Sequence, residues 1–171
     1  MKKYLFLDID GVLAVPDEKV KEWVLNKERQ ILLGKILTET GAEIVLSSSW
    51  RENTLEGTRK YMTSEGFLFS DLIVGITIRA YHYIDRSHKI HLSIPRGVEI
   101  QQWIDTNVHS DQGKNFDRKK VGVDYTYCIL DDDRDMLLHQ GKYFVNTDST
   151  EGLTEENAQW CIDILNGNYL P

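Results

Sequence analysis

Aspartates follow two apolar segments of this chain, at positions where they could bind a metal ion or act as nucleophiles. Asp8 and Asp10 come directly after the apolar residues 4–7, and three consecutive aspartates, residues 131–133, come directly after residues 127–130. Carboxylates that lie close together repel one another and raise one another's pKa unless a cation lies between them. Carboxylate oxygens are hard ligands that suit Mg²⁺, and a magnesium ion calls for a substrate oxyanion, most often a phosphate.

A third group of polar residues follows another apolar segment. Residues 47–49 are three serines that come after residues 44–46, and Trp50 and Arg51 follow them. By themselves, the serines are also typical of a polar loop that caps a helix, and the second and third are individually expected to be structural. Trp50 is expected to be a packing residue. Arg51 could touch a substrate or form a salt bridge.

The order of the expected elements predicts a sheet that positions these polar groups. Short apolar runs alternate with helical patterns, which is typical of a parallel sheet with crossover helices. The expected strands cover residues 4–7, 44–46, 72–74, 127–130 and 143–145, and the expected helices cover about 27–40, about 54–65, a segment from Arg96 and a segment after Thr154. We therefore predict an α/β fold, a Rossmann-like, doubly wound parallel sheet with residues 4–7 at its centre. The carboxyl ends of its strands share one edge, where ligands bind, so the aspartates and serines are expected to converge.

These residues, in this order, resemble the haloacid dehalogenase (HAD) superfamily of phosphatases that use an aspartate nucleophile. Residues 8–13, which follow an apolar strand, look like the first signature of that superfamily. Ser47, Arg96 and the pair Asp131 and Asp132 stand where the other three signatures are expected, so the resemblance spans essentially the whole chain. The HAD domains associated with nucleic-acid repair proteins are also similar to residues 44–51, 96–104, 130–136 and 146–153.

The resemblance implies a reaction and a role for each matching residue. Asp8 would attack phosphorus and form an aspartyl-phosphate, and Asp10 would protonate the leaving oxygen and then take a proton from water. Ser47 and nearby backbone N–H groups would hold phosphoryl oxygens. Arg96 would offset the charge on the transferred group. The expected substrate-binding neighbours are Gly11, Ser48 and Arg51.

Mg²⁺ is the cofactor that the resemblance implies. Its implied ligands are Asp8, the backbone carbonyl of Asp10, and the acidic pair Asp131 and Asp132. Asp132 is expected to be the direct metal ligand of that pair, with Asp131 close by. In the alternative alignment with the family's signature, the acidic pair would be Asp131 and Asp135. The third aspartate of the run is expected to be solvated or to cap a helix.

Substrate-selecting caps of HAD enzymes are expected to be minimal here. Residues 11–25 read as irregular, and the loop over residues 15–25 leaves room only for a flap. Residues 77–95 predict a small hairpin-like insertion in a single catalytic domain over residues 1–171. An open site would admit a polynucleotide end as well as a nucleotide. Basic and aromatic residues within 79–96 suit phosphate chains and stacked bases, or else belong to a solvated hairpin. Lys89 in this segment competes for the role of Arg96.

Composition limits the classes of function. The chain has 20 basic and 27 acidic residues, and the net charge of −7 excludes a protein that coats nucleic acid. Cys128 and Cys161 lie in apolar runs and are expected to be buried free thiols. No apolar run approaches the roughly 20 residues of a membrane-spanning helix, so a cytoplasmic protein without a membrane partner is expected.

The sequence therefore favours a Mg²⁺-dependent phosphomonoester hydrolase that forms an aspartyl-phosphate. Its expected substrate is a phosphorylated small molecule or nucleic-acid end, with a nucleotide or polynucleotide end preferred. The alternatives are a phosphoacceptor or phosphate-binding module without turnover, and a HAD phosphatase for another small phosphometabolite. The oligomeric state is left open by the sequence.

Overall fold

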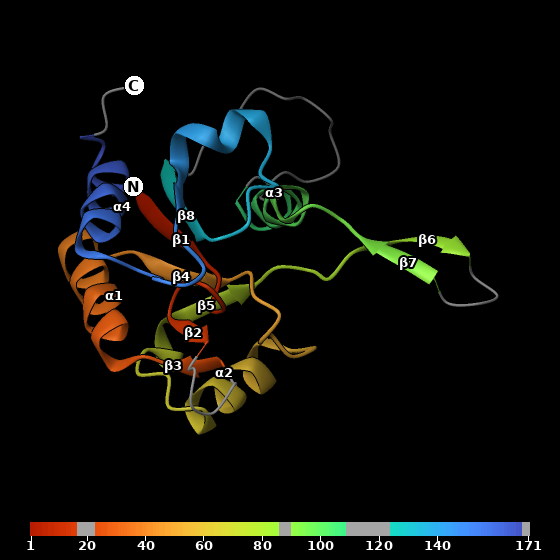
Figure 1. Cartoon of the computed structure of the whole chain (residues 1–171). Coiled ribbons are helices and arrows are strands. Elements are labelled where there is room, and N and C mark those ends of the chain that lie inside the picture. The colour runs from red at the N-terminus through yellow and green to blue at the C-terminus, as the bar shows by residue number, and fades with distance from the viewer. Residues whose placement is uncertain (17–22, 86–89, 109–123, 169–171) are drawn as a thin grey trace.

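A five-stranded parallel sheet forms the centre of the molecule (Figure 1). The computed structural model describes residues 1–16, 23–85, 90–108 and 124–168. The strand order is β5-β4-β1-β8-β9, so the uniformly apolar β1 is central, as predicted. The strands are β1 (Lys2–Leu7), β4 (Glu43–Leu46), β5 (Ile73–Ile76), β8 (Tyr125–Asp131) and β9 (Phe144–Asn146). The predicted Rossmann-like α/β fold is confirmed.

Helices cover both faces of the sheet, and local capping signals fix where they begin and end. The helices are α1 (Lys27–Thr40), α2 (Leu55–Ser64), α3 (Arg96–Asn107) and α4 (Glu155–Asn166). The Asn26 side chain accepts hydrogen bonds from two backbone N–H groups in the first turn of α1, and Gly41 ends that helix at φ 67°. Thr154 begins α4 with a capping box.

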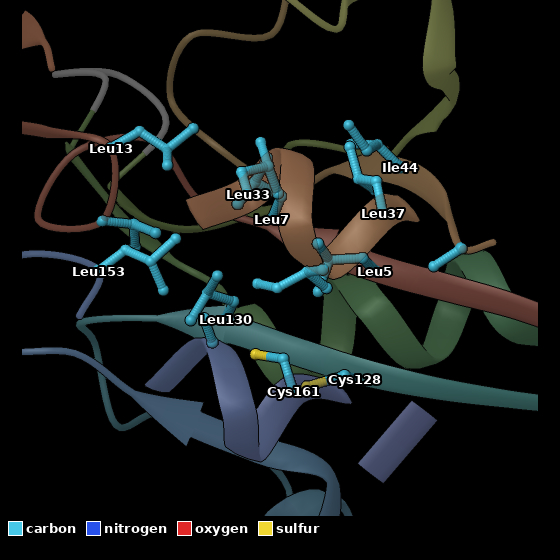
Figure 2. Packing of buried hydrophobic residues seen from close by; sticks show 14 of the residues in the cluster. Leu5, Leu7, Leu13, Leu33, Leu37, Ile44, Cys128, Leu130, Leu153 and Cys161 are labelled. Carbon is cyan, nitrogen blue, oxygen red and sulfur yellow. The ribbon is translucent and has the colours of Figure 1, made fainter. Parts of the chain in front are cut away.

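The alternation of side chains along the strands divides the core into two layers. One layer contains the inward-facing residues of α1 and α4 and one face of the sheet, including Leu5, Leu7 and Leu130 (Figure 2). The predicted buried free thiols, Cys128 on β8 and Cys161 on α4, lie close together in this layer and are confirmed.

The second layer lies between the other face of the sheet and α3. Tyr4 and Phe6 point to this face, where the Trp103 ring of α3 makes edge-on contacts with them at centroid distances of 5.2 and 5.5 Å. Strand β5 passes close under the same indole: a Cβ at Gly75 would lie 2.7 Å from the Trp103 ring nitrogen. Large side chains therefore fix the position of α3, and with it the position of Arg96 at the start of that helix.

Two small antiparallel hairpins lie outside the central sheet. Strands β6 (Tyr81–Asp85) and β7 (Ile90–Ser93) form the hairpin predicted within residues 77–95, and it projects away from the sheet (Figure 1). Strands β2 (Ala14–Pro16) and β3 (Trp23–Leu25) form a second pair, so the prediction that residues 11–25 are irregular was wrong in part. Strands of three residues, one of which ends at Pro16, are too short to give a recognisable alternation.

Two short 3₁₀ helices complete the described chain: η1 (Ser70–Leu72) and η2 (Leu138–Tyr143). The connection from β8 to β9 passes through η2 instead of a crossover α-helix. Within the residues that the structure describes, no helix is long and apolar enough to cross a membrane.

Candidate active site

The carboxyl ends of β1, β4 and β8 place three of the predicted site residues side by side. The last apolar residues of these strands pair with one another in register, and the residues that follow them are Asp8, Ser47 and Asp131. The backbone N–H of Asp8 donates to the carbonyl of Leu130 at 3.0 Å, and that of Ser47 donates to the carbonyl of Leu7 at 2.9 Å. The sheet itself therefore brings these residues to one edge.

Three carboxylates gather at this edge. Carboxylate oxygens of Asp8, Asp131 and Asp132 all lie within 4.8 Å of one another. Asp8 is 5% exposed and Asp131 is fully buried. The guanidinium of Arg96 lies 3.7 Å from Oδ2 of Asp8 and 3.6 Å from Oδ2 of Asp131. Asp135, the alternative partner of Asp131, instead accepts a hydrogen bond from the backbone N–H of Arg96 at 2.8 Å.

Burial and mutual repulsion disfavour the charged forms of these carboxyl groups. Burial raises the pKa of Asp131 to about 8, and the charge of Asp8 adds to the rise. Burial also raises the pKa of Asp8 to about 6, although Arg96 opposes the rise. Burial alone would lower the pKa of Arg96, but the surrounding carboxylates, Asp8 first, raise it overall. One guanidinium thus faces three carboxylates, an imbalance that a bound cation would relieve.

The donor set suits a hard divalent cation. Oδ2 of Asp131 is buried and has no hydrogen-bond partner among the described residues. Oδ1 of Asp131 accepts from the backbone N–H of Asp133 at 3.0 Å, which fixes the carboxylate in place. Clustered carboxylate oxygens with one oxygen left unsatisfied fit Mg²⁺ better than a softer metal.

Gly11 is the position that allows Asp132 to approach the cluster. Its φ is +68°, and a Cβ there would lie 2.3 Å from Cγ of Asp132. The carbonyl of Gly11 accepts a hydrogen bond from Oγ1 of Thr147 at 2.7 Å. Nδ2 of Asn146 donates to the carbonyls of Asp131 and Asp132 at 3.1 and 2.8 Å. The last residue of β9 and the residue after it therefore position both acidic loops.

Asp10 lies apart from the three-carboxylate cluster and is held by the loop after β4. Its Oδ1 accepts a hydrogen bond from Nε1 of Trp50 at 2.8 Å, and its Oδ2 accepts one from Oγ of Ser49 at 3.1 Å. Asp10 is partly exposed, whereas Asp8 is buried. The two aspartates of the first signature thus have separate environments and separate hydrogen-bond partners.

The first two serines after β4 are both fully buried, but their hydroxyl groups differ in environment. Ser48 forms a side-chain hydrogen bond with Asp8 that lowers the pKa of that carboxyl group. The Ser48 hydroxyl also accepts from the backbone N–H of Trp50 at 3.3 Å. Oγ of Ser47 has no hydrogen-bond partner among the described residues, which leaves a buried donor free to meet a ligand.

Arg51 forms the salt bridge that was one of its two predicted roles. Its guanidinium lies 2.7 Å from Oε2 of Glu99, with both side chains buried, and it also donates to the carbonyl of Ile78 at 2.7 Å. The other oxygen of Glu99 accepts from the backbone N–H of Ala80 at 2.9 Å. This buried pair joins the loop after β4, the first turn of α3 and the base of the β6–β7 hairpin.

A pocket of about 220 Å³ lies beside Arg96. Arg51, Arg79, Glu99 and Asp133 also contribute to its lining. Arg79 donates to the carbonyls of the 49–51 loop. Lys89 and Arg86, and the side chains of residues 81–92 generally, lie outside the described part of the chain.

Four contributors to the site were missed by sequence reasoning: Ser49 and Trp50 were interpreted as structural, and Asn146 and Thr147 had no individual role. Asn146 is the last residue of β9, and the other three follow the carboxyl end of a sheet strand by four residues or fewer. That position on the shared edge is the signal that could have drawn attention to them.

Comparison with known proteins adds one match. A family model described as the HAD domain in Swiss Army Knife RNA repair proteins matches residues 4–158. No curated protein and no solved structure matched the chain. The matched region contains every residue of the carboxylate cluster and extends through the loop after β9 into α4.

Proposed function

Because the chain belongs to the family of HAD domains in Swiss Army Knife RNA repair proteins, we propose that it is a Mg²⁺-dependent phosphomonoesterase for a nucleotide or polynucleotide end. The observation that carries this proposal is the separation of the two aspartates. Asp8 lies against Asp131, Asp132 and Arg96, whereas Asp10 lies outside that cluster on the same edge. This arrangement suits one carboxylate for nucleophilic attack and another for proton transfer.

The residues that would hold the metal are Asp8, Asp131 and Asp132, together with the backbone carbonyl of Asp10. A bound Mg²⁺ would neutralise charge between the nucleophile and the phosphoryl group. The unsatisfied Oδ2 of Asp131 and the close approach of Asp132 to Gly11 support this set of ligands. Asp132 is the more accessible of the acidic pair, which supports its assignment as the direct ligand.

In the proposed reaction, Asp8 attacks phosphorus and the bond from phosphorus to the leaving oxygen breaks. Asp10 donates its proton to that oxygen as the alcohol departs, which leaves a phosphoryl group on Asp8. The Asp10 carboxylate then takes a proton from water, and the water oxygen attacks the same phosphorus. Inorganic phosphate leaves, Asp8 is again a carboxylate, and Asp10 is again protonated.

The remaining residues stabilise charge or hold the substrate. Arg96 contacts both Asp8 and Asp131, so its guanidinium is close enough to balance charge that develops on the transferred phosphoryl group. The free hydroxyl of Ser47 is available to donate to a phosphoryl oxygen. Ser48 orients Asp8 through its side-chain hydrogen bond. Gly11 keeps space for Asp132, and Arg51 holds the loop that carries the serines.

Release of inorganic phosphate from phosphorylated oligonucleotides, nucleoside monophosphates and sugar phosphates tests this function. We expect release that needs Mg²⁺, that favours the nucleotide substrates and that is lost in Asp8→Asn. The exposed Asp148→Asn, in the loop after β9, is the matched control and should keep wild-type activity. Equal activity of Asp8→Asn and the wild type would contradict the proposed nucleophile, and a preference for sugar phosphates by orders of magnitude would contradict the proposed substrate.

A phosphoacceptor without turnover is the second candidate, and one observation favours it. Each carboxylate oxygen of Asp10 already accepts a hydrogen bond from the chain itself, so a leaving group would have to share its oxygen with Trp50 or Ser49. A stable phosphoryl group on Asp8 with negligible phosphate release would support this candidate over the esterase.

A further inference from the structure

An aromatic pair lies next to the proposed acid–base residue. The rings of Trp50 and Tyr61 have centroids 6.0 Å apart at an angle of 51°, and Nε1 of Trp50 donates to Oδ1 of Asp10 at 2.8 Å. Trp50 follows β4 and is half-buried against the core, whereas Tyr61 belongs to α2 and is 37% exposed. We propose that Trp50 and Tyr61 form a stacking surface for the nucleobase of the leaving nucleoside.

The position of Asp10 defines the side from which the leaving group departs. A residue that protonates the leaving oxygen must come within about 2.6–3.2 Å of it. The Trp50 indole donates a hydrogen bond to the Asp10 carboxylate, so the group attached to the leaving oxygen must lie close to the indole. The aromatic pair is therefore a neighbour of the leaving group, while Arg96 lies on the side of the phosphoryl group.

The charges around the pair favour a neutral aromatic group over a second phosphate. Besides burial, the charges of Glu65, Glu52 and Asp10 raise the pKa of the Tyr61 hydroxyl, so the field at that hydroxyl is negative. A phosphate at this place would be repelled, whereas a nucleobase can stack on an aromatic ring whatever its sequence. Basic side chains lie instead at the pocket beside Arg96, where Arg79 also contributes.

This assignment rests on the proposed function and narrows it. A sugar phosphate without a base would use the phosphoryl-binding residues but would leave the aromatic pair without a partner. A nucleoside phosphate would use both, so the class of substrate is one whose phosphate-bearing sugar carries a base.

The experiment compares short oligonucleotides phosphorylated at the 3′ or the 5′ end, in which the phosphate-bearing residue is either adenosine or an abasic sugar. We expect the wild type to prefer the adenosine substrate in kcat/KM by on the order of 5- to 150-fold, the range for stacking of one base. Tyr61→Ala should lose most of this preference. Tyr61→Phe, which keeps the ring, should retain it. Trp160→Ala removes an exposed aromatic side chain of α4 and is the matched control for loss of such a group.

Equal kcat/KM for the two substrates in the wild type, or an equal loss on both in Tyr61→Ala, would overturn the stacking assignment while leaving phosphatase activity in place. If no phosphate is released from any substrate, the proposed function fails separately. The ratio of the dissociation constants of the adenosine and abasic oligonucleotides then decides on stacking by the same criteria.

Discussion

Removal of Glu99 should destabilise the protein far more than removal of an exposed acid. The Arg51 and Glu99 side chains are only 5% and 7% exposed, and their charged atoms are 2.7 Å apart. Loss of one partner of a buried ion pair costs about 3–5 kcal/mol, because the other charge stays buried without compensation. In Glu99→Ala the Ala80 N–H also loses its acceptor, whereas Arg51 keeps the carbonyl of Ile78. The retained bond favours the lower end of that range, about 3 kcal/mol.

Urea unfolding with linear extrapolation measures this loss, and the same change lowers Tm by about 6–12 °C for a domain of this size. Glu56→Ala breaks an exposed pair with Lys60 on α2 and should leave the unfolding midpoint unchanged. The double variant Arg51→Met with Glu99→Met should lose less stability than Glu99→Ala, since no charge stays buried. A Glu99→Ala protein within about 1 kcal/mol of the wild type would refute the reasoning.

Three further outcomes are expected. Without metal, the folded-state pKa of Asp131 is about 8 against 3.8 for the free side chain, so the folded state binds the extra proton and stability falls as pH rises between these values. Tm measured in EDTA at several pH values should show this fall in the wild type and a smaller fall in Asp131→Asn. Excess Mg²⁺ in place of EDTA should oppose the fall in the wild type. Gly11→Ala places a Cβ 2.3 Å from Cγ of Asp132 and should abolish the Mg²⁺ binding that calorimetry measures in the wild type. The control is Gly41→Ala, at nearly the same φ but with no atom within 4 Å of the added Cβ. It should cost only about 1–2 kcal/mol of stability and leave metal binding intact. Trp50→Phe removes the N–H donor to the acid–base residue and should lower kcat about tenfold with a smaller change in KM for an abasic substrate, which steady-state kinetics would reveal. Unchanged values in Asp131→Asn, Gly11→Ala or Trp50→Phe would count against the corresponding role.

The sheet was predictable because its strands are apolar on both faces and because the helices carry their own caps. Asn26, Gly41 and Thr154 act within a few residues of their positions in the sequence, so local chemistry was sufficient to place α1 and the start of α4. The pairing of β2 with β3 was not predictable in the same way. It joins strands of three residues each, and pairing across the sequence gap leaves no periodic pattern.

In the candidate site, too, the residues recognisable from local sequence were predictable and those defined by distant contacts were not. Asp8 and the acidic pair at the end of β8 are recognisable because aspartates stand directly after an apolar run. The register of a parallel sheet brings them together. The hydrogen bond from Trp50 to Asp10 spans 40 positions, and that from Thr147 to Gly11 spans 136. Such contacts depend on how loops meet at the sheet edge. The residue types tryptophan and threonine do not by themselves indicate that a side chain positions a catalytic loop.

The fold also shows where part of the net charge of −7 is concentrated. Three of the 27 acidic residues converge to within 4.8 Å at the strand ends, where one guanidinium balances only part of their charge. The acidity that excludes a protein coating nucleic acid therefore includes a cluster that suits a divalent cation and, through it, a phosphate.

Trapping of the phosphoryl group on Asp8 tests the central claim most directly. A short reaction of the wild type with a phosphorylated oligonucleotide and Mg²⁺ would be quenched in acid, reduced with labelled borohydride and mapped by peptide mass spectrometry. We expect the label at Asp8, in an amount that falls as phosphate is released, and none in the Asp8→Asn variant. Phosphate release without label at Asp8, or with label at another residue, would contradict the account.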